Sequence, residues 1–208
     1  MPSDISIDKD RLVEWASRAI DTPSFTGSEE AMAELMRETF FDLGLQAQWQ
    51  QVEDGRANVL GTRAGTGGGP SLMFNGHMDT SYSGREPWLR HVPGFQPKAF
   101  VEDGRLYGLG ISNMKGALAC YVEALRALGD AGIRLRGDVM IAAVSGEIEK
   151  TQWGEAQGIR RFVASISPRN EPSLTIIRRL GFVRTGEQWD EEDGLEHVFE
   201  LVGARLPV

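Results

Sequence analysis

The sequence predicts an α/β protein with a central mixed or mostly parallel sheet flanked by helices. Apolar residues recur at helical spacing over 8–21, 28–43 and 113–128. A short apolar run at 71–74 precedes the third of these helices, and a strongly apolar run at 138–144 follows it. This succession of strand, helix and strand is typical of a βαβ unit and therefore of a layered α/β sheet.

The elements follow in order along the first three-quarters of the chain. Asp8 stands where a helix cap is expected before the helix at 8–21. Asp54-Gly55 predicts a tight turn between strands at 46–52 and 57–62, and Asp103-Gly104 predicts another between two short strands. The three prolines and the weak periodicity of residues 81–97 predict a loop.

The character of the chain changes after about Trp153. A strand candidate at 162–166 is followed by a predicted helix at 171–180 and a strand-like tail. We therefore expect two domains, with 1–153 as the first and 154–208 as the second, of different origin.

Composition narrows the classes of function. The chain has a net charge of -8 and a pI of about 5.0, which disfavours nucleic acid as a partner. Its single cysteine, Cys120, excludes an intramolecular disulfide. The acidic N-terminus does not have the pattern of a secretory signal, and no window approaches the ~18 apolar residues of a membrane span. These observations predict a cytoplasmic protein without a membrane partner.

Polar residues gather at three places where a predicted strand ends or a helix begins, which is where ligands bind in open α/β sheets. They are His77 with Asp79, then Asn113, then Glu147 with Glu149. Imidazole is a zinc ligand, a neighbouring carboxylate can orient it, and a further carboxylate can take a proton from metal-bound water. Taken singly, each motif has an ordinary structural explanation, such as a tight turn or a solvated glutamate pair. Their joint order favours a metal site.

These motifs resemble those of the dinuclear zinc hydrolases that include acetylornithine deacetylase, succinyl-diaminopimelate desuccinylase, aminoacylase and carboxypeptidase G. The resemblance covers residues 1–153. The matching stretches are Asn75-Gly76-His77-Met78-Asp79-Thr80, Tyr107 to Ala117 around Asn113, and Ser145-Gly146-Glu147-Ile148-Glu149-Lys150.

The resemblance implies one or two zinc ions, which cobalt can replace. It implies that His77 binds zinc, that Asp79 orients His77, that Glu147 is the general base and that Glu149 is a further metal ligand. The family usually has adjacent glutamates here, so Ile148 leaves the roles of Glu147 and Glu149 open. Asn113 stands where the family has the aspartate that bridges both metals. Its neutral amide oxygen predicts lower metal affinity or an altered metal number.

The tail from Val163 to Glu187 resembles the C-terminal part of a GNAT-type N-acetyltransferase. That resemblance implies that Asn170 and Ser173 lie near acetyl-CoA. Asn170 can equally serve as the cap of the helix at 171–180, and Gly181 can end that helix.

Three functional hypotheses follow. The first is a zinc-dependent hydrolase of N-acyl or peptide bonds in amino-acid-like small molecules. Members of that family continue with further metal ligands beyond the matched part, so the resemblance predicts descent more firmly than turnover. The second is an acetyl-CoA-dependent acetyltransferase fragment. The third is an inactive chimeric scaffold, for which a homodimer is one arrangement that would cover an exposed sheet.

Overall fold

The computed structural model describes residues 5–148, 161–179, 181–191 and 194–202. The chain divides into two compact units, Met1–Ile148 and Glu149–Val208. The predicted domain boundary at 153/154 lies outside the described residues. Within the described ranges, no helix is long and apolar enough to cross a membrane.

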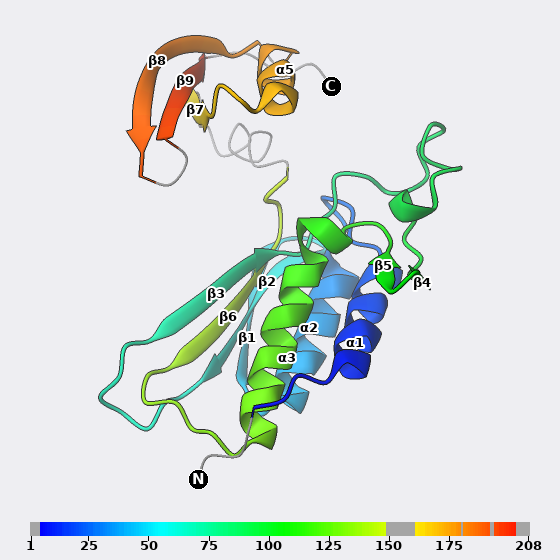
Figure 1. Ribbon diagram of the computed structural model, residues 1–208, viewed down its shortest axis with the longest axis vertical. Helices are drawn as coiled ribbons and strands as arrows, with labels where there is room; N and C mark the ends of the chain where they lie inside the picture. The colour runs from blue at the N-terminus through cyan, green and yellow to red at the C-terminus, as the bar shows by residue number, and fades with distance from the viewer. Residues whose placement is uncertain (1–4, 149–160, 180, 192–193, 203–208) are drawn as a thin grey trace. The chain divides into compact units, whose positions relative to one another are not determined.

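The first unit alternates helices and strands along the chain (Figure 1). Its elements are α1 (Lys9–Asp21), α2 (Glu30–Asp42), β1 (Gln46–Glu53), β2 (Arg56–Arg63), β3 (Leu72–His77), the 3-10 turn η1 (Pro93–Phe95), β4 (Phe100–Glu102), β5 (Arg105–Tyr107), the π-type turn η2 (Ile111–Lys115), α3 (Gly116–Asp130) and β6 (Val139–Val144).

Four strands form a mixed sheet in the order β1-β2-β6-β3. β1 pairs with β2 and β2 with β6 in antiparallel orientation, whereas β3 pairs with β6 in parallel. The chain passes from β3 through α3 to β6, so the predicted βαβ unit and the predicted α/β class are confirmed. The parallel register sets His77 opposite Val144, so the end of β3 lies beside the start of the turn that carries Glu147.

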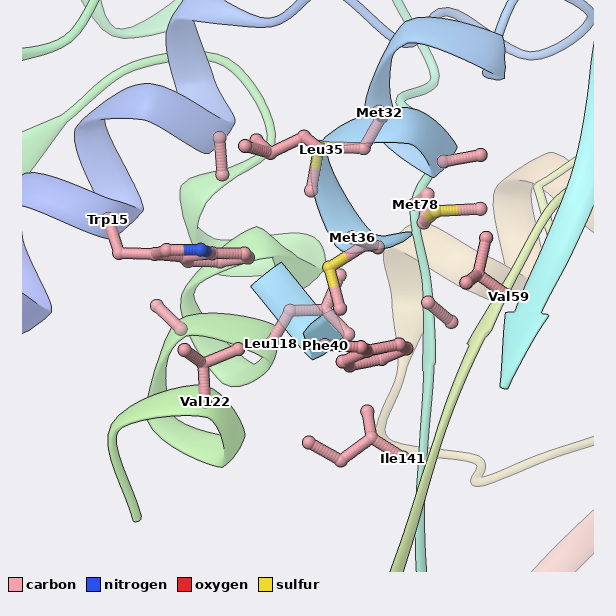
Figure 2. Close-up of a cluster of buried hydrophobic side chains, with 14 of the residues drawn as sticks. Trp15, Met32, Leu35, Met36, Phe40, Val59, Met78, Leu118, Val122 and Ile141 are labelled. Atoms are coloured by element: carbon pink, nitrogen blue, oxygen red, sulfur yellow. The ribbon is translucent and has the colours of Figure 1, made fainter. Parts of the chain in front are cut away.

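Helices α1, α2 and α3 lie along one face of this sheet (Figure 1). The core forms between the helices and the sheet, and Figure 2 shows Met36 and Phe40 of α2 close to Val59 and Ile141 of the strands. The Phe40 ring packs directly onto β2 at Gly61, where an added Cβ would lie 2.6 Å from the ring. This close packing keeps the sheet rigid, and the polar residues that follow the carboxyl ends of β3 and β6 are attached to it.

The first helix begins as predicted, because the Asp8 carboxylate accepts hydrogen bonds from the backbone N–H groups of Asp10 and Arg11. The predicted start of the third helix at 113 is wrong. Regular helix begins at Gly116, and Asn113 and Met114 have non-helical backbone angles.

The described part of the second unit is an antiparallel sheet with the helix α5. It comprises β7 (Arg161–Ile166), α5 (Glu171–Arg179), β8 (Val183–Asp190) and β9 (Gly194–Val202), with strand order β7-β9-β8. A small core of Leu174, Phe182, Phe199 and Leu201 lies within it. The predicted strand and helix are confirmed, and the strand-like tail proves to be two paired strands.

Candidate metal-binding site

His77 is the last residue of β3, and its ring is held in one orientation. The side chain is only 5% exposed, and Nδ1 lies 3.0 Å from the backbone oxygen of Asp79. Because a carbonyl oxygen only accepts, Nδ1 carries the hydrogen, and in the neutral ring Nε2 therefore bears the lone pair. Nε2 lies 2.9 Å from Oδ1 of Asn113.

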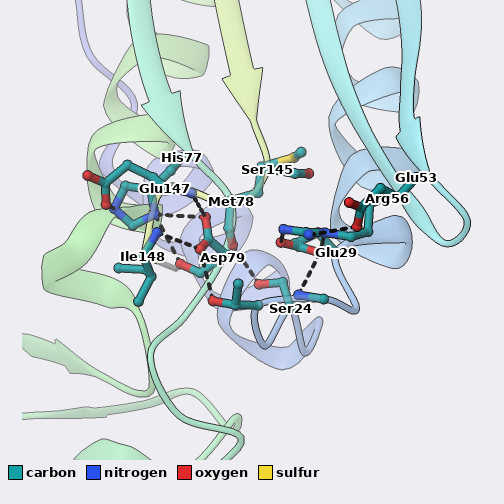
Figure 3. Close-up of polar contacts among 12 residues, drawn as sticks. Ser24, Glu29, Glu53, Arg56, His77, Met78, Asp79, Ser145, Glu147 and Ile148 are labelled. Atoms are coloured by element: carbon teal, nitrogen blue, oxygen red, sulfur yellow. Dashed lines mark hydrogen bonds and ion pairs between the residues drawn. The ribbon is translucent and has the colours of Figure 1, made fainter. Parts of the chain in front are cut away.

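Asp79 is fully buried beside this ring, and its carboxylate is surrounded by donors (Figure 3). It accepts hydrogen bonds from Thr26 Oγ1 at 3.0 Å, Glu147 N at 3.2 Å and Ile148 N at 3.0 Å. Its Oδ1 lies 3.4 Å from Nδ1 of His77. Burial alone would raise the pKa of Asp79, but the contacts with His77, Ile148 N–H and Thr26 lower it to about 2. Asp79 is therefore ionised at neutral pH and joins three segments of the chain.

One of those segments, the stretch before α2, was not predicted to contribute. Thr80 N donates to Ser24 O at 2.9 Å, Thr26 N donates to Thr80 O, and Ser24 Oγ donates to Met78 O at 2.6 Å. The segment thus lies against residues 78–80 and carries the Thr26 hydroxyl to Asp79. Thr26 shows no motif of its own in the sequence, so only the tertiary contact reveals it.

The turn after β6 holds Glu147. Ser145 N donates to Asn58 Oδ1 at 2.9 Å and Ser145 Oγ donates to Ala57 O at 2.8 Å, so the turn is tied to β2. Gly146 has a φ of +79°, a conformation that favours glycine. The Glu147 side chain is 42% exposed, and its Oε2 lies 3.9 Å from Nε2 of His77.

A buried ion pair supports the same turn and was also missed from sequence. Glu29 is fully buried, and both of its oxygens accept hydrogen bonds from Arg56 at 2.9 Å (Figure 3). The hydrogen bonds to Glu29 raise the pKa of Arg56. A Cβ placed on Gly146 would be 2.6 Å from Arg56 Nη2, so the guanidinium packs directly under the turn.

Asn113 reaches His77 because the η2 turn is anchored by Lys115. The Lys115 ammonium is almost fully buried and donates to the backbone oxygens of Ala19 and Thr22, both at 2.7 Å. Burial lowers the pKa of Lys115 to about 7. These bonds to the end of α1 hold the turn away from regular helix, which explains why helical periodicity misplaced the start of α3.

The pair formed by His77 and Asn113 fits two adjacent ligands of one metal ion. With metal–ligand bonds of about 2.0–2.2 Å, two ligands are roughly 3 Å apart at a right angle and roughly 3.4 Å apart at the tetrahedral angle. The observed separation of 2.9 Å is close to the first value. The Nε2 lone pair of neutral His77 faces the Asn113 amide across this gap, so both groups are available to a cation placed between them. Burial lowers the pKa of His77, but contacts with Asp79 and Asn113 and the nearby carboxylates raise it overall.

The ligand set that can be traced is incomplete. Within the described ranges, no three His, Cys, Asp or Glu side chains converge closely enough to hold a metal ion. Glu149, which the sequence predicts as a ligand, lies outside those ranges. The structure brings together His77, Asp79, Asn113 and Glu147, so four of the five residues predicted for this site share one location.

In the second unit, Asn170 acts as a helix cap, because its Oδ1 accepts a hydrogen bond from Ser173 N at 3.2 Å. Both residues line a pocket of about 500 Å³ between β7, the start of α5 and Glu196 of β9. The capping role is therefore confirmed, and contact with acetyl-CoA stays a prediction.

A histidine, an amide and a carboxylate thus lie near the carboxyl ends of two strands of an α/β sheet, which is where proteins of this class bind ligands. The sequence matches Peptidase family M20/M25/M40 over residues 73–203, and the chain belongs to this family. The match continues through most of the second unit, and the comparisons give no support for an acetyltransferase origin of that part.

Two curated relatives are also similar to this chain in sequence. Succinyl-diaminopimelate desuccinylase of Alkalilimnicola ehrlichii is 35% identical over 150 residues, which are 72% of this chain and 36% of that protein. N-formyl-4-amino-5-aminomethyl-2-methylpyrimidine deformylase of Bacillus subtilis is 35% identical over 108 residues, which are 51% of this chain and 25% of that protein. The chain thus spans about a third of the first relative and a quarter of the second.

Solved structures show the same fold. A tripeptidase from Staphylococcus aureus has a TM-score of 0.59 at 18% identity, covering 93% of this chain and 65% of its own. The aminopeptidase PepT from Bacillus cereus has a TM-score of 0.60 at 17% identity, covering 96% of this chain and 68% of its own.

Proposed function

We propose that this chain is a metal-dependent hydrolase of N-acyl or peptide bonds in small amino-acid-like molecules. The observation that carries the proposal is the 2.9 Å approach of His77 Nε2 to Asn113 Oδ1, with the Glu147 carboxylate 3.9 Å from the same nitrogen. Membership of the M20/M25/M40 family supports amide-bond hydrolysis. The names of the two curated relatives, a desuccinylase and a deformylase, indicate removal of an acyl group.

Each residue has a distinct role in this proposal. His77 and Asn113 would hold a zinc ion, or cobalt in its place, with Glu149 as a further ligand. Such an ion polarises an acyl oxygen and lowers the pKa of bound water. Glu147 would take the proton of the attacking water, because it combines exposure with proximity to His77.

Asp79 would orient His77 and would not exchange protons. Its pKa of about 2 and its three hydrogen-bond donors keep it ionised throughout neutral pH. By holding Nδ1–H of the ring, Asp79 and its own backbone oxygen direct the lone pair of Nε2 outward.

Metal retention tests the proposal together with activity. We expect the dialysed protein to keep zinc, measured by elemental analysis, and to release the acyl group of an N-acetyl or N-succinyl amino acid. His77→Ala should abolish both. His91→Ala, which changes an exposed histidine of the 81–97 loop, is the matched control and should leave both intact. Absence of zinc from the unmodified chain, or equal zinc in the His77→Ala variant, would contradict the proposal.

A further inference from the structure

A pocket of about 290 Å³ opens next to the segment that carries Asp79. Most of its walls come from residues 23–28 and 80–85, and residues 96–97, Leu109 and Lys115 complete the lining. The first two segments are held together by the Ser24, Thr26 and Thr80 hydrogen bonds described above. Thr80, which directly follows Asp79, lies in the wall. None of the residues assigned to the metal site lines the pocket, so it is a separate cavity that shares its support with that site.

The pocket has an aromatic rim. Phe25 is 37% exposed and Tyr82 is 39% exposed, although both are large side chains that ordinarily gain by burial. Phe95 packs edge-to-face on Tyr82 with ring centroids 6.2 Å apart, which supports the Tyr82 ring in its place in the lining. Exposed aromatic rings around a concave surface are typical of a ligand site.

The pocket also contains an unneutralised cation. Two basic residues line it. Lys115 donates to the backbone oxygens of Ala19 and Thr22, whereas the exposed Arg85 guanidinium has no hydrogen bond or ion pair in the part of the chain that the structure describes. Its neighbour Glu86 accepts from Ser83 N and Oγ at 2.9 Å. Several other arginines of this unit, such as Arg11 and Arg56, do pair with carboxylates. No Asp or Glu is among the described lining residues, so the charge of Arg85 is left for a ligand.

We propose that this pocket binds the free carboxylate and the adjoining apolar side chain of an N-acyl amino acid, with Arg85 as the anion-binding residue. This inference rests on the proposed function and names the part of the substrate that the protein recognises. A guanidinium matches a carboxylate through two parallel hydrogen bonds, and the aromatic rim suits an apolar side chain. The volume lies near the lower end of the range for small-molecule pockets, which suits one amino-acid residue.

Binding to metal-free protein tests the pocket apart from turnover. The two ligands are N-acetyl-L-phenylalanine and its C-terminal amide, which differ only in the carboxylate, and binding is measured by NMR titration. We expect the acid to bind at least about tenfold more tightly than the amide. Arg85→Gln should weaken binding of the acid by a similar factor, so that the acid and the amide bind equally well. Arg105→Gln removes an exposed arginine of β5 outside the pocket and should change neither value.

Equal binding of the acid and the amide to the unmodified chain, or no binding of either, would overturn the proposal. So would unchanged binding of the acid to Arg85→Gln, or an equal loss of binding in Arg105→Gln. Because the protein is stripped of metal, these outcomes are independent of whether His77 holds zinc. A chain that retains zinc but fails this titration keeps the proposed function and loses the carboxylate pocket.

Discussion

Removal of the Glu29 carboxylate tests how a buried ion pair supports the turn that carries Glu147. Glu29 is fully buried and accepts from Arg56 Nε and Nη2 at 2.9 Å and from Gly27 N at 3.0 Å. Glu29→Ala leaves the Gly27 N–H without this acceptor and Arg56 without its main partner. Breaking one side of a buried ion pair costs about 3–5 kcal/mol. Arg56 keeps Glu53 at 3.1 Å, so we expect a loss near the lower end, roughly 3 kcal/mol.

The protein is unfolded in urea, and unfolding is monitored through hydrogen exchange of the backbone amides in β2 and β6. These amides report the first unit alone, which matters because the chain has two units. Arg56→Met and the double variant complete a thermodynamic cycle. Since the two side chains act on each other, the double variant should cost less than the sum of the single variants by about 1–3 kcal/mol. A loss below about 1 kcal/mol in Glu29→Ala, or strict additivity, would refute the reasoning.

Three further predictions concern the site. Asn113→Asp should tighten zinc binding by at least about tenfold, because a carboxylate replaces a neutral oxygen beside His77; competition with a chelator measures it, and equal affinity would contradict it. At about pH 9, where the buried Lys115 amine is neutral, Lys115→Met should lower the free energy of unfolding by about 1–3 kcal/mol through loss of two hydrogen bonds, and a change under about 0.5 kcal/mol in urea unfolding would contradict it. In metal-free protein, ionised Asp79 should contribute about 2 kcal/mol above pH ~4, and this should be lost as the pH falls through about 2. Urea unfolding across that range should show a loss about 2 kcal/mol larger in the unmodified chain than in Asp79→Asn, because the other carboxylates titrate in both proteins.

Local signals in the sequence identified most of the elements. The Asp8 cap and the Asp-Gly turns act within a few residues, so the pattern alone predicts α1 and the hairpin of β1 and β2. The order of the sheet depends on contacts between distant segments. Nothing local in β2 indicates that its second neighbour is β6, which lies beyond β3 and α3 in the chain.

The same distinction explains the misplaced start of α3. Residues 113–128 have helical periodicity, which predicts a helix through Asn113. The Lys115 ammonium instead bonds to the end of α1, more than 90 residues away, and the turn takes its shape from that contact. This irregular turn is what brings the Asn113 amide to His77.

The polar site shows what motifs can and cannot reveal. His77, Asp79, Asn113 and Glu147 stood out because their types and order are unusual together. Thr26 contacts Asp79 from 53 residues away, and Glu29 contacts Arg56 from 27 residues away, in segments without a recognisable pattern. Such supporting residues are chosen by tertiary geometry, so they emerge only once the fold is known.

Charge at the site links Asn113 to the activity that we propose. His77 and Asn113 are neutral ligands, so Glu149 is the one charged residue of the proposed ligand set and compensates only one charge of a divalent ion. Asp79 is already engaged by three hydrogen-bond donors. Glu147 is the nearest remaining described carboxylate, and a role as metal ligand would compete with its role as a base. A carboxylate at position 113 would relieve this conflict, because it would compensate one charge of the ion and leave Glu147 to take the proton. We therefore expect Asn113→Asp to increase metal affinity and hydrolysis together, whereas a structural role for Asn113 alone predicts that neither increases.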